Sequence, residues 1–276
     1  VKVNLSSGAL GQSNKNNSSS NKYNKKVVAV LPARMASTRF PNKPLAKILG
    51  KEMILWVAEG AAKSKLVDEV IIATDHIEIQ KVAQEAGWKV SMTSSDLPSG
   101  SDRIWAAIQN YTADIVVNVQ GDEPLINGDV IDAAVQPLLE NSDLEMSTLA
   151  HTISVDELYS ENVAKVIVDA NGCAIYFSRF PIPYSREKVL QKVEGQPSVV
   201  NGCLKHIGLY AYQKTFLQKY CSMAPVTIET SESLEQLRAL YLGAKIKVVP
   251  VDFQSQGVDV PSDIAKVEAR LQNFKK

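Results

Sequence analysis

The sequence has few of the features that mark membrane, secreted or nucleic-acid-binding proteins. Its 276 residues include only three cysteines, an odd number without metal-ligand spacing, so we expect buried free thiols and a reducing, cytoplasmic setting. No apolar run approaches the roughly 20 residues of a membrane-spanning helix. Lysine plus arginine total 30, as do aspartate plus glutamate, so no basic excess favours binding to nucleic acid.

The first 25 residues also lack what a folded segment needs. Residues 13–22 are almost entirely serine, asparagine and lysine, and such a stretch cannot bury enough apolar surface to offset its ordering entropy. The segment has no apolar centre of the kind found in secretory signals. We therefore expect a disordered tail over residues 1–25 and one folded domain over residues 26–276, whose core the 45% apolar content of the chain can supply.

Beyond the tail, apolar strands alternate with helices. The expected strands are apolar on both faces, as in a parallel sheet covered by helices, so we predict an α/β fold. Ser101 is the predicted N-cap of the third helix. The strands are predicted at 27–31, 70–73 and 115–119, and the helices at 54–63, 77–86 and 101–111.

The pattern changes near residue 144, and we predict a β-rich insertion at about 150–215. Two strands, 163–168 and 173–177, flank a turn at residues 169–172, and a third strand covers 204–212. Beyond the insertion the α/β pattern returns. It predicts a helix at 233–241, a strand at 245–251 and a last helix at 262–273.

A basic loop comes directly after the first strand. Arg34, Arg39 and Lys43 are spaced along it, and ligands of open α/β sheets bind at the carboxyl ends of strands. Three cations there could neutralise a triphosphate and stabilise a departing pyrophosphate. An ordinary solvated basic loop explains the same residues equally well.

Two aspartates are candidate metal ligands. Asp122 comes after an apolar strand and Gly121, where its carboxylate would suit Mg²⁺, although Gly-Asp is also a common turn pair. Asp259 precedes the last helix and could complete such a site. Sequence spacing does not show that the two residues meet.

Further polar residues lie in and after the insertion. Arg179 ends a strand and has the planar fork that suits a carboxylate. His206 and Tyr210 share one face of the 204–212 strand, and Glu235 and Gln236 lie on the next helix. A lone histidine or tyrosine on a strand is more often structural than catalytic.

In this order, the clusters resemble the 3-deoxy-manno-octulosonate (Kdo) cytidylyltransferases, or CMP-Kdo synthetases, over about residues 27–271. The resemblance implies a Rossmann-like nucleotidyltransferase core with a mixed, mostly parallel sheet, and an insertion that serves dimerisation and sugar binding. It rests on nine motifs in register. They are 32–34, 39–45, 73–75, 99–103, 118–124, 176–179, 206–212, 233–238 and 257–259.

The resemblance also implies a reaction and its residues. The family couples CTP to Kdo with Mg²⁺, releasing pyrophosphate, for lipopolysaccharide precursor synthesis, and its members are homodimers. The implied metal ligands are Asp122 and Asp259. The implied nucleotide-binding residues are Pro32, Ala33, Arg34, Arg39, Lys43, Ser99 and Arg103, of which Arg34 and Lys43 hold the phosphates. The implied sugar-binding residues are Gln120, Arg179, His206, Tyr210, Glu235 and Gln236.

Departures from the family pattern leave alternatives open. Leu97 stands where histidine is usual and Ser101 where threonine is usual, which resembles enzymes that use the 8-amino sugar. The 206–212 segment resembles the Kdo type, which we favour. A CMP-sialic acid synthetase would usually follow Lys43 with asparagine instead of Pro44. A nucleotide-binding module without turnover would not need both Asp122 and Asp259.

Overall fold

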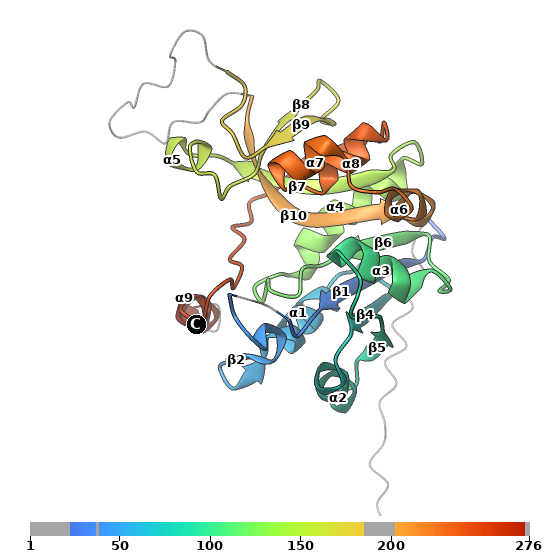
Figure 1. The fold of residues 1–276 in the computed structure, drawn as a ribbon, viewed down its shortest axis with the longest axis vertical. Helices are drawn as coiled ribbons and strands as arrows, with labels where there is room; N and C mark the ends of the chain where they lie inside the picture. The colour runs from blue at the N-terminus through green and yellow to red at the C-terminus, as the bar shows by residue number, and fades with distance from the viewer. Residues whose placement is uncertain (1–22, 37–38, 185–201, 274–276) are drawn as a thin grey trace, which may run out of the picture.

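The computed structural model describes residues 23–36, 39–184 and 202–273. Within these ranges, the main sheet has the strand order β11–β7–β10–β6–β1–β4–β5, and a β8–β9 hairpin extends it from β10 (Figure 1). The strands of this sheet are β1 (Val27–Ala33), β4 (Glu69–Thr74), β5 (Lys89–Met92), β6 (Ile115–Asn118), β7 (Met146–Thr152), β8 (Lys165–Val168), β9 (Ala174–Ser178), β10 (Leu204–Gln213) and β11 (Ile246–Pro250). A two-stranded ribbon pairs β2 (Lys47–Ile48) with β3 (Lys51–Glu52).

The sheet is mixed but mostly parallel. Strand β1 pairs in parallel with β4 and β6, and β4 pairs in parallel with β5. Strand β10 runs antiparallel to both of its neighbours, β6 and β7, while β11 is parallel to β7. The predicted α/β fold class is confirmed.

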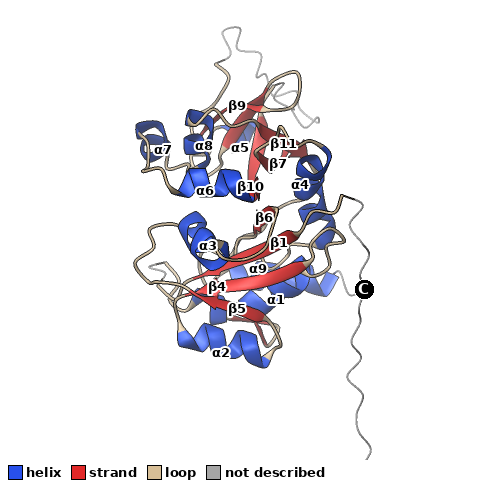
Figure 2. Cartoon of the chain, turned by 90° about the vertical axis from the view of Figure 1, so that its right-hand side faces the viewer, coloured by secondary structure: helices blue, strands red, loops and turns tan. Residues whose placement is uncertain are grey.

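Helices cover both faces of the sheet (Figure 2). Helices α1, α2 and α4 pack on one face, and α3, α6 and α8 pack on the other. The helices are η1 (Lys43–Leu45), α1 (Met53–Ala61), α2 (Ile77–Glu85), α3 (Gly100–Ile108), α4 (Gly128–Glu140), α5 (Val155–Leu158), α6 (Lys214–Cys221), α7 (Thr227–Glu232), α8 (Gln236–Tyr241) and α9 (Asp263–Asn273). The longest described helix, α4, has 13 residues, too few to cross a bilayer.

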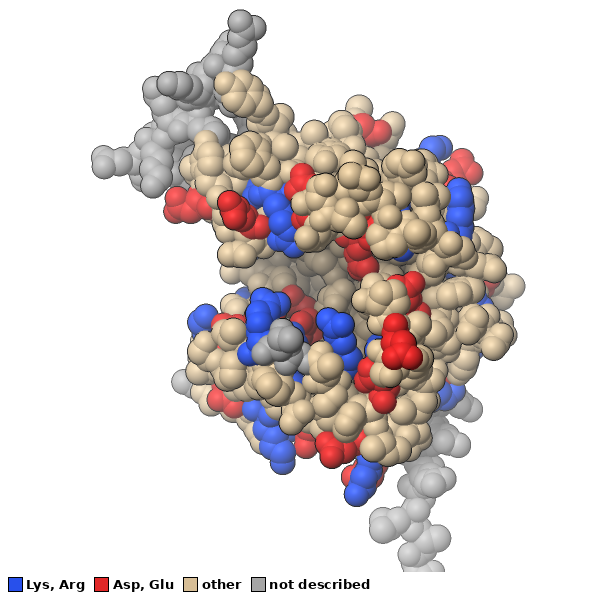
Figure 3. Space-filling view, in the orientation of Figure 1, with Lys and Arg blue, Asp and Glu red and all other residues tan. Residues whose placement is uncertain are grey.

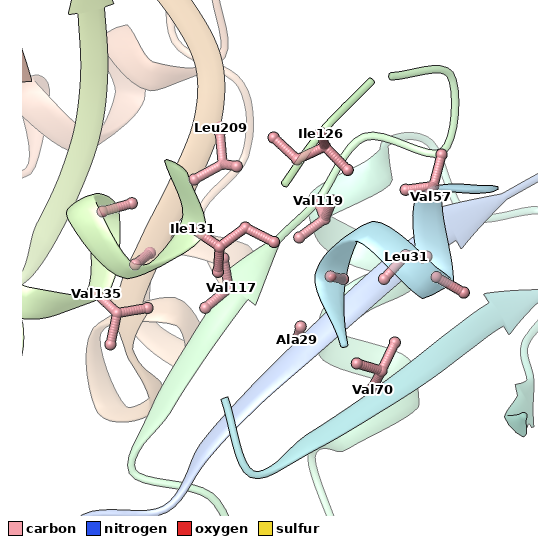
Figure 4. Close-up of a cluster of buried hydrophobic side chains, with 14 of the residues drawn as sticks. Ala29, Leu31, Val57, Val70, Val117, Val119, Ile126, Ile131, Val135 and Leu209 are labelled. Atoms are coloured by element: carbon pink, nitrogen blue, oxygen red, sulfur yellow. The ribbon is translucent and has the colours of Figure 1, made fainter. Parts of the chain in front are cut away.

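Strand β1 is buried on both faces, as its sequence predicts. Ala29 and Leu31 enter the core beneath α1, where Val117 of the neighbouring strand joins them (Figure 4). Val28 and Val30 enter the core on the opposite face. Burying one such aliphatic side chain contributes roughly 1.5–3 kcal/mol to the free energy of unfolding. This packing fixes the ends of β1 and β6, from which the functional loops leave.

The predicted strands and helices all form, with each end within three residues of the predicted one. The predicted N-cap of α3 was wrong: Ser99 caps this helix through the backbone N–H of Asp102, because α3 begins one residue earlier than expected. The helix predicted from residue 233 begins at Gln236, since Ser233 adopts the left-handed conformation with φ 52°.

The region predicted as an insertion is built into the main sheet. Strand β10, its longest strand, lies between β6 and β7, and β8 pairs with the start of β10. The predicted turn between β8 and β9 forms, with Gly172 at φ 71°.

Most of the predicted disordered tail, residues 1–22, lies outside the described residues. Its last residues belong to the folded part of the protein. Lys25 Nζ donates to Leu138 O at 3.0 Å, and Gln136 Nε2 lies 3.2 Å from the Tyr23 hydroxyl. The predicted tail boundary at residue 25 was therefore too late, because these two side chains pack on helix α4.

Candidate active site

A cavity of about 430 Å³ opens where β1 and β6 end. The two strands are parallel, so the loops after Ala33 and Asn118 leave from the same edge of the sheet. Figure 3 shows the hollow between the two halves of the molecule, with lysine and arginine side chains gathered on its lower rim. The cavity is lined by Pro32, Ala33, Arg34, Ala36, Arg39, Lys43, Pro44, Leu97, Ser99, Gly100, Arg103, Gln120, Gly121, Asp122 and Asp259.

The two candidate metal ligands meet in this cavity. Lys43 Nζ donates to Asp122 Oδ2 and lies 3.8 Å from Asp259 Oδ1. Arg39 donates to the same Asp259 oxygen at 3.0 Å. The basic loop and both carboxylates therefore form one cluster, in which each carboxylate already has a cationic partner.

The segment before Asp259 is held against the turn that contains Asp122. Val258 N donates to Asp122 O at 3.0 Å, and Ser255 Oγ donates to Glu123 Oε1. A Cβ on Gly257 would lie 3.3 Å from that same Glu123 oxygen, so the two chain segments are in close contact. These contacts set the position from which Asp259 reaches the cavity.

Glu123 is a residue to which the sequence analysis assigned no role. Burial raises the pKa of Glu123 to about 7, and the nearby charge of Asp122 adds to the shift, while the Ser255 hydrogen bond opposes it. Its second oxygen, Oε2, is buried without a hydrogen-bond partner among the described residues. Glu123 could have been found from the sequence, because it is the second carboxylate of the Asp-Glu pair that follows strand β6.

Gly121 is required by a close approach of two chain segments. A Cβ at this position would lie 2.8 Å from Pro32 O, too near for any side chain. The absence of a side chain lets the Asp122 turn lie directly against the end of β1.

The amino end of α3 forms another wall of the cavity. Ser99 caps the helix by accepting from Asp102 N at 3.1 Å and donates to Asp102 Oδ2 at 2.6 Å. Arg103 is 3% exposed, and its guanidinium donates to Thr93 Oγ1 at 2.6 Å and to Asp75 Oδ2 at 2.8 Å. Arg103 thus lines the cavity but is held mainly by protein partners.

The other predicted sugar residues gather around Tyr210. The Tyr210 hydroxyl donates to Gln236 Oε1 at 3.2 Å, and its ring lies 5.5 Å from that of His206. The charges of Glu235 and Arg179 are both close enough to act on the Tyr210 hydroxyl, whose pKa burial raises. His206, Tyr210, Glu235 and Gln236 therefore form one cluster, and Arg179 is held to the segment before Glu235 through Glu232 O.

Arg179 and His206 are both fixed by protein contacts. The Arg179 guanidinium donates to Glu232 O at 2.9 Å and to Glu161 O at 3.2 Å. His206 Nε2 lies 2.9 Å from Thr148 Oγ1, and burial lowers the pKa of His206 to about 3. His206 is therefore a neutral hydrogen-bonding group near neutral pH.

Two amide nitrogens beside Tyr210 lack partners among the described residues: Gln236 Nε2 and Asn118 Nδ2. Buried N–H groups are rarely left unpaired, so both are candidate donors to a ligand. The sequence analysis placed Asn118 within the 115–119 strand and gave it no ligand role.

The sixth predicted sugar residue, Gln120, connects the cluster to the cavity. It lines the cavity, and its Nε2 lies 3.5 Å from Asn118 Oδ1. Asn118 is paired with Tyr210 between β6 and β10. The cavity and the Tyr210 cluster therefore adjoin along the end of β6.

The donor set fits Mg²⁺ better than a transition metal. Within the described ranges, no group of three or more histidine, cysteine, aspartate or glutamate side chains could hold an ion by itself. Two carboxylates, from Asp122 and Asp259, face one cavity lined by cations. Mg²⁺ binds through one or two carboxylates together with substrate phosphates, so this pair suits an ion that arrives with a nucleotide.

Comparison with known proteins identifies the family. Residues 28–246 match a family model described as Cytidylyltransferase. A 3-deoxy-manno-octulosonate cytidylyltransferase of Bdellovibrio bacteriovorus is 53% identical over 248 residues, covering 90% of this chain and 98% of the relative. The enzyme of the same name from Pelobacter propionicus is 48% identical, covering 89% and 97%.

Solved structures agree with the sequence relatives. CMP:2-keto-3-deoxy-manno-octonic acid synthetase, solved in complex with CTP, is 38% identical with a TM-score of 0.83, covering 91% of this chain and 100% of its own. A cytidylyltransferase from Leptospira borgpetersenii shares the fold at 18% identity and a TM-score of 0.60, covering 91% of this chain and 88% of its own. The chain belongs to the 3-deoxy-manno-octulosonate cytidylyltransferase family and is a nucleotidyltransferase.

Proposed function

We propose that this enzyme transfers the cytidylyl group of CTP to the anomeric C2 hydroxyl of Kdo, for lipopolysaccharide precursor synthesis. The hydroxyl oxygen attacks the α-phosphorus, the bond from that phosphorus to the bridging oxygen of the β-phosphate breaks, and pyrophosphate leaves. The hydroxyl proton is lost in the same process. The observation that carries the proposal is the meeting of Lys43, Asp122 and Asp259 in one cavity at the ends of β1 and β6.

The basic loop would bind the triphosphate. Arg34 is exposed at the cavity, and Lys43 and Arg39 are paired with the two aspartates. Incoming phosphates would draw Lys43 and Arg39 away from the carboxylates, exchanging one ion pair for another. The same cations would then stabilise the charge that develops on the leaving pyrophosphate.

Asp122 and Asp259 would hold Mg²⁺. When bound, the ion would lower the pKa of the hindered anomeric hydroxyl and polarise the α-phosphate. The two carboxylates are acceptors only. They can therefore pair with Lys43 before substrate binds and with Mg²⁺ afterwards. Pro32, Ala33, Ser99 and Arg103 line the part of the cavity that would receive cytosine and ribose.

The Tyr210 cluster would bind the sugar. Gln236 and Asn118 each offer sugar hydroxyls a buried amide N–H that has no partner in the described part of the chain. Arg179 would pair with the sugar carboxylate, which requires its guanidinium to exchange some of its contacts with backbone carbonyls. Its contacts to Glu161 O and Ser233 O, at 3.2 and 3.4 Å, are the longer ones and are the first that a carboxylate would replace.

We further propose a homodimer in a reducing cytoplasm. Phe180 and Tyr184, just beyond β9, are 74% and 89% exposed, and we place them at the contact between the two subunits. The free thiols of Cys173, Cys203 and Cys221 accord with a reducing compartment. Sedimentation of the wild type and of a Phe180→Ala/Tyr184→Ser variant tests the assembly: a wild-type monomer would refute it.

A pyrophosphate-release assay tests the function. The enzyme is incubated with CTP, Mg²⁺ and, separately, Kdo, 8-amino-Kdo and N-acetylneuraminate. We expect the highest specificity constant with Kdo. A preference of more than about tenfold for the 8-amino sugar, equal to about 1.4 kcal/mol, would reassign the substrate. If no sugar leads to pyrophosphate release, the proposed reaction is wrong and the protein is a nucleotide-binding module without turnover.

A further inference from the structure

Ser101 lies in the nucleotide-side motif but its side chain is directed elsewhere. Its neighbours Ser99 and Gly100 line the nucleotide cavity. Ser101 itself is 1% exposed, and its hydroxyl donates to Glu235 Oε2 at 3.2 Å. This bond joins the first turn of α3 to the residue just before α8, which is on the sugar side of the site.

The contact belongs to a connected set of side chains from strand β10 and helix α6. Burial raises the pKa of Tyr212 on β10, and the nearby Ser101 hydroxyl opposes that shift. The Tyr220 hydroxyl donates to the backbone oxygen of Glu235 at 2.9 Å. Two residues before Tyr212 on β10, Tyr210 donates to Gln236. Tyr210 and Tyr220 thus hold the Gln236 side chain and the Glu235 backbone, and Ser101 holds the Glu235 carboxylate.

Glu235 depends on this donor because its other neighbours do not neutralise it. Burial raises the pKa of Glu235, and the Ser101 hydrogen bond opposes that shift. Arg238, the nearest cation, is already engaged: its Nε donates to Glu229 Oε2 at 2.8 Å. Glu229 and Asp102 add negative charge nearby. Without the Ser101 hydroxyl, the Glu235 carboxylate would be protonated more readily, and its orientation would be less firmly fixed.

We propose that Ser101 is a positioning residue for the sugar substrate, acting through Glu235 from within the nucleotide motif. The inference rests on the proposed role of Glu235 in sugar binding. A substitution of this residue beside the CTP cavity should therefore change the KM for Kdo. A hydroxyl at position 101 is what matters, so threonine should serve as well as serine.

The experiment measures the Michaelis constants for both substrates in Ser101→Ala and Ser101→Thr. We expect Ser101→Ala to raise the KM for Kdo about tenfold, equal to about 1.4 kcal/mol, and to change the KM for CTP less than about twofold. Ser101→Thr should restore the KM for Kdo to within about threefold of wild type. Ser91→Ala is the matched control, since its hydroxyl also faces α3, 3.5 Å from Ala107 O, away from both substrate regions.

A double-mutant cycle with Glu235→Gln separates the inference from the proposed function. If Ser101 acts through Glu235, Ser101→Ala should add little to the KM for Kdo in the Glu235→Gln background. If Glu235→Gln raises that KM but Ser101→Ala does not, the inference fails and the role of Glu235 stands. If neither variant changes it, both fail. Should Ser101→Ala not fold, Ser101→Cys replaces the hydroxyl by a weak donor and must shift the KM for Kdo in the same direction.

Discussion

The two halves of the site use charge in opposite ways. On the nucleotide side, Lys43, Arg39, Asp122 and Asp259 are solvent-accessible and paired with one another. On the side proposed for the sugar, His206 and Tyr210 are held neutral by burial, and each bonds to a fixed protein partner. The first region can exchange its ion pairs when a polyanion arrives, and the second presents a preformed set of hydrogen-bonding groups.

This difference suits the two ligands. A triphosphate is bound by charge, and mobile cations with exchangeable partners can follow it as pyrophosphate departs. A sugar is distinguished by the placement of hydroxyls, and rigid buried groups reject an analogue that leaves them unpaired. The comparison predicts that variants on the nucleotide side alter turnover and CTP use, whereas variants on the sugar side alter selectivity and acid stability.

The largest effect should come from the two carboxylates. Asp122→Asn and Asp259→Asn should each lower kcat at least about a hundredfold, because each removes a carboxylate ligand of the Mg²⁺ that would stabilise the transition state. Circular dichroism and melting temperature should stay close to wild type. Near-normal activity of either variant at low Mg²⁺ would remove that residue from the metal site.

The cations should affect one substrate only. Arg34→Ala and Lys43→Ala should each remove a charge-assisted contact worth roughly 1.5–3 kcal/mol, raising the KM for CTP about ten- to a hundredfold. The KM for Kdo should change little. Lys81→Ala, on the exposed face of α2, controls for the loss of a surface charge. Equal changes in both Michaelis constants would contradict the assignment of Arg34 and Lys43 to CTP binding alone.

The contact between Glu123 and Ser255 should affect the Mg²⁺ concentration that the enzyme needs, but not whether the protein folds. Ser255→Ala and Glu123→Ala should each raise the Mg²⁺ concentration for half-maximal activity about threefold, because Asp259 is then held less firmly beside Asp122. The double variant should be no worse than the more severe single variant. Mg²⁺-dependent quenching of the fluorescence of a labelled CTP analogue provides a readout independent of turnover. Additive effects would show that the two side chains act separately.

His206 should make the protein sensitive to acid. Its pKa is about 3 in the folded state against an ordinary value of 6.5, so the unfolded chain binds a proton that the folded chain does not between these values. The free energy of unfolding should therefore be level above pH 6.5 and fall towards pH 3, by up to about 1.4 kcal/mol per pH unit from this group. Urea unfolding of His206→Gln should show a smaller fall, with His151→Gln on β7 as control. An unchanged slope would contradict the burial argument.

The smallest effect concerns the amino end of the chain. Deleting residues 1–22 should leave activity and melting temperature unchanged, because their polar composition provides no apolar face. Deleting residues 1–25 should lower the free energy of unfolding by about 1 kcal/mol, since Tyr23 and Lys25 then lose their contacts with α4. Two truncations with identical melting curves would show that those contacts contribute nothing.

The nucleotide side was predictable because its residues are adjacent to strand ends. Arg34 comes after β1 and Asp122 after β6, and parallel neighbours deliver such residues to one edge. The apolar runs of β1, β4 and β6 likewise determined the α/β class. Local sequence did not show the pairing of Asp122 with Asp259, since it depends on contacts of Glu123 and Val258 that have no local pattern.

The residues proposed for the sugar were grouped from the sequence only through family resemblance. The residues proposed for it lie on β10, after β6 and β9, and at the start of α8, and their meeting depends on β10 entering the main sheet between β6 and β7. The sequence suggested a separate β-rich insertion instead, because antiparallel and parallel strands of similar composition look alike. The N-cap of α3 was misjudged by two residues, since Ser99 and Ser101 both satisfy the capping pattern and only geometry separates them.

The segment that carries Asp259 also has an evolutionary consequence. It runs from β11 to α9, held by Glu123 and Asp122 on the way and by Glu268, which accepts from Leu49 N at 2.7 Å, beyond its end. Inserting or deleting one residue in it would move Asp259 by about 3.3 Å, more than the length of a magnesium–oxygen bond of about 2.1 Å. Selection should therefore conserve the number of residues between Phe253 and Asp259 more strictly than their identities.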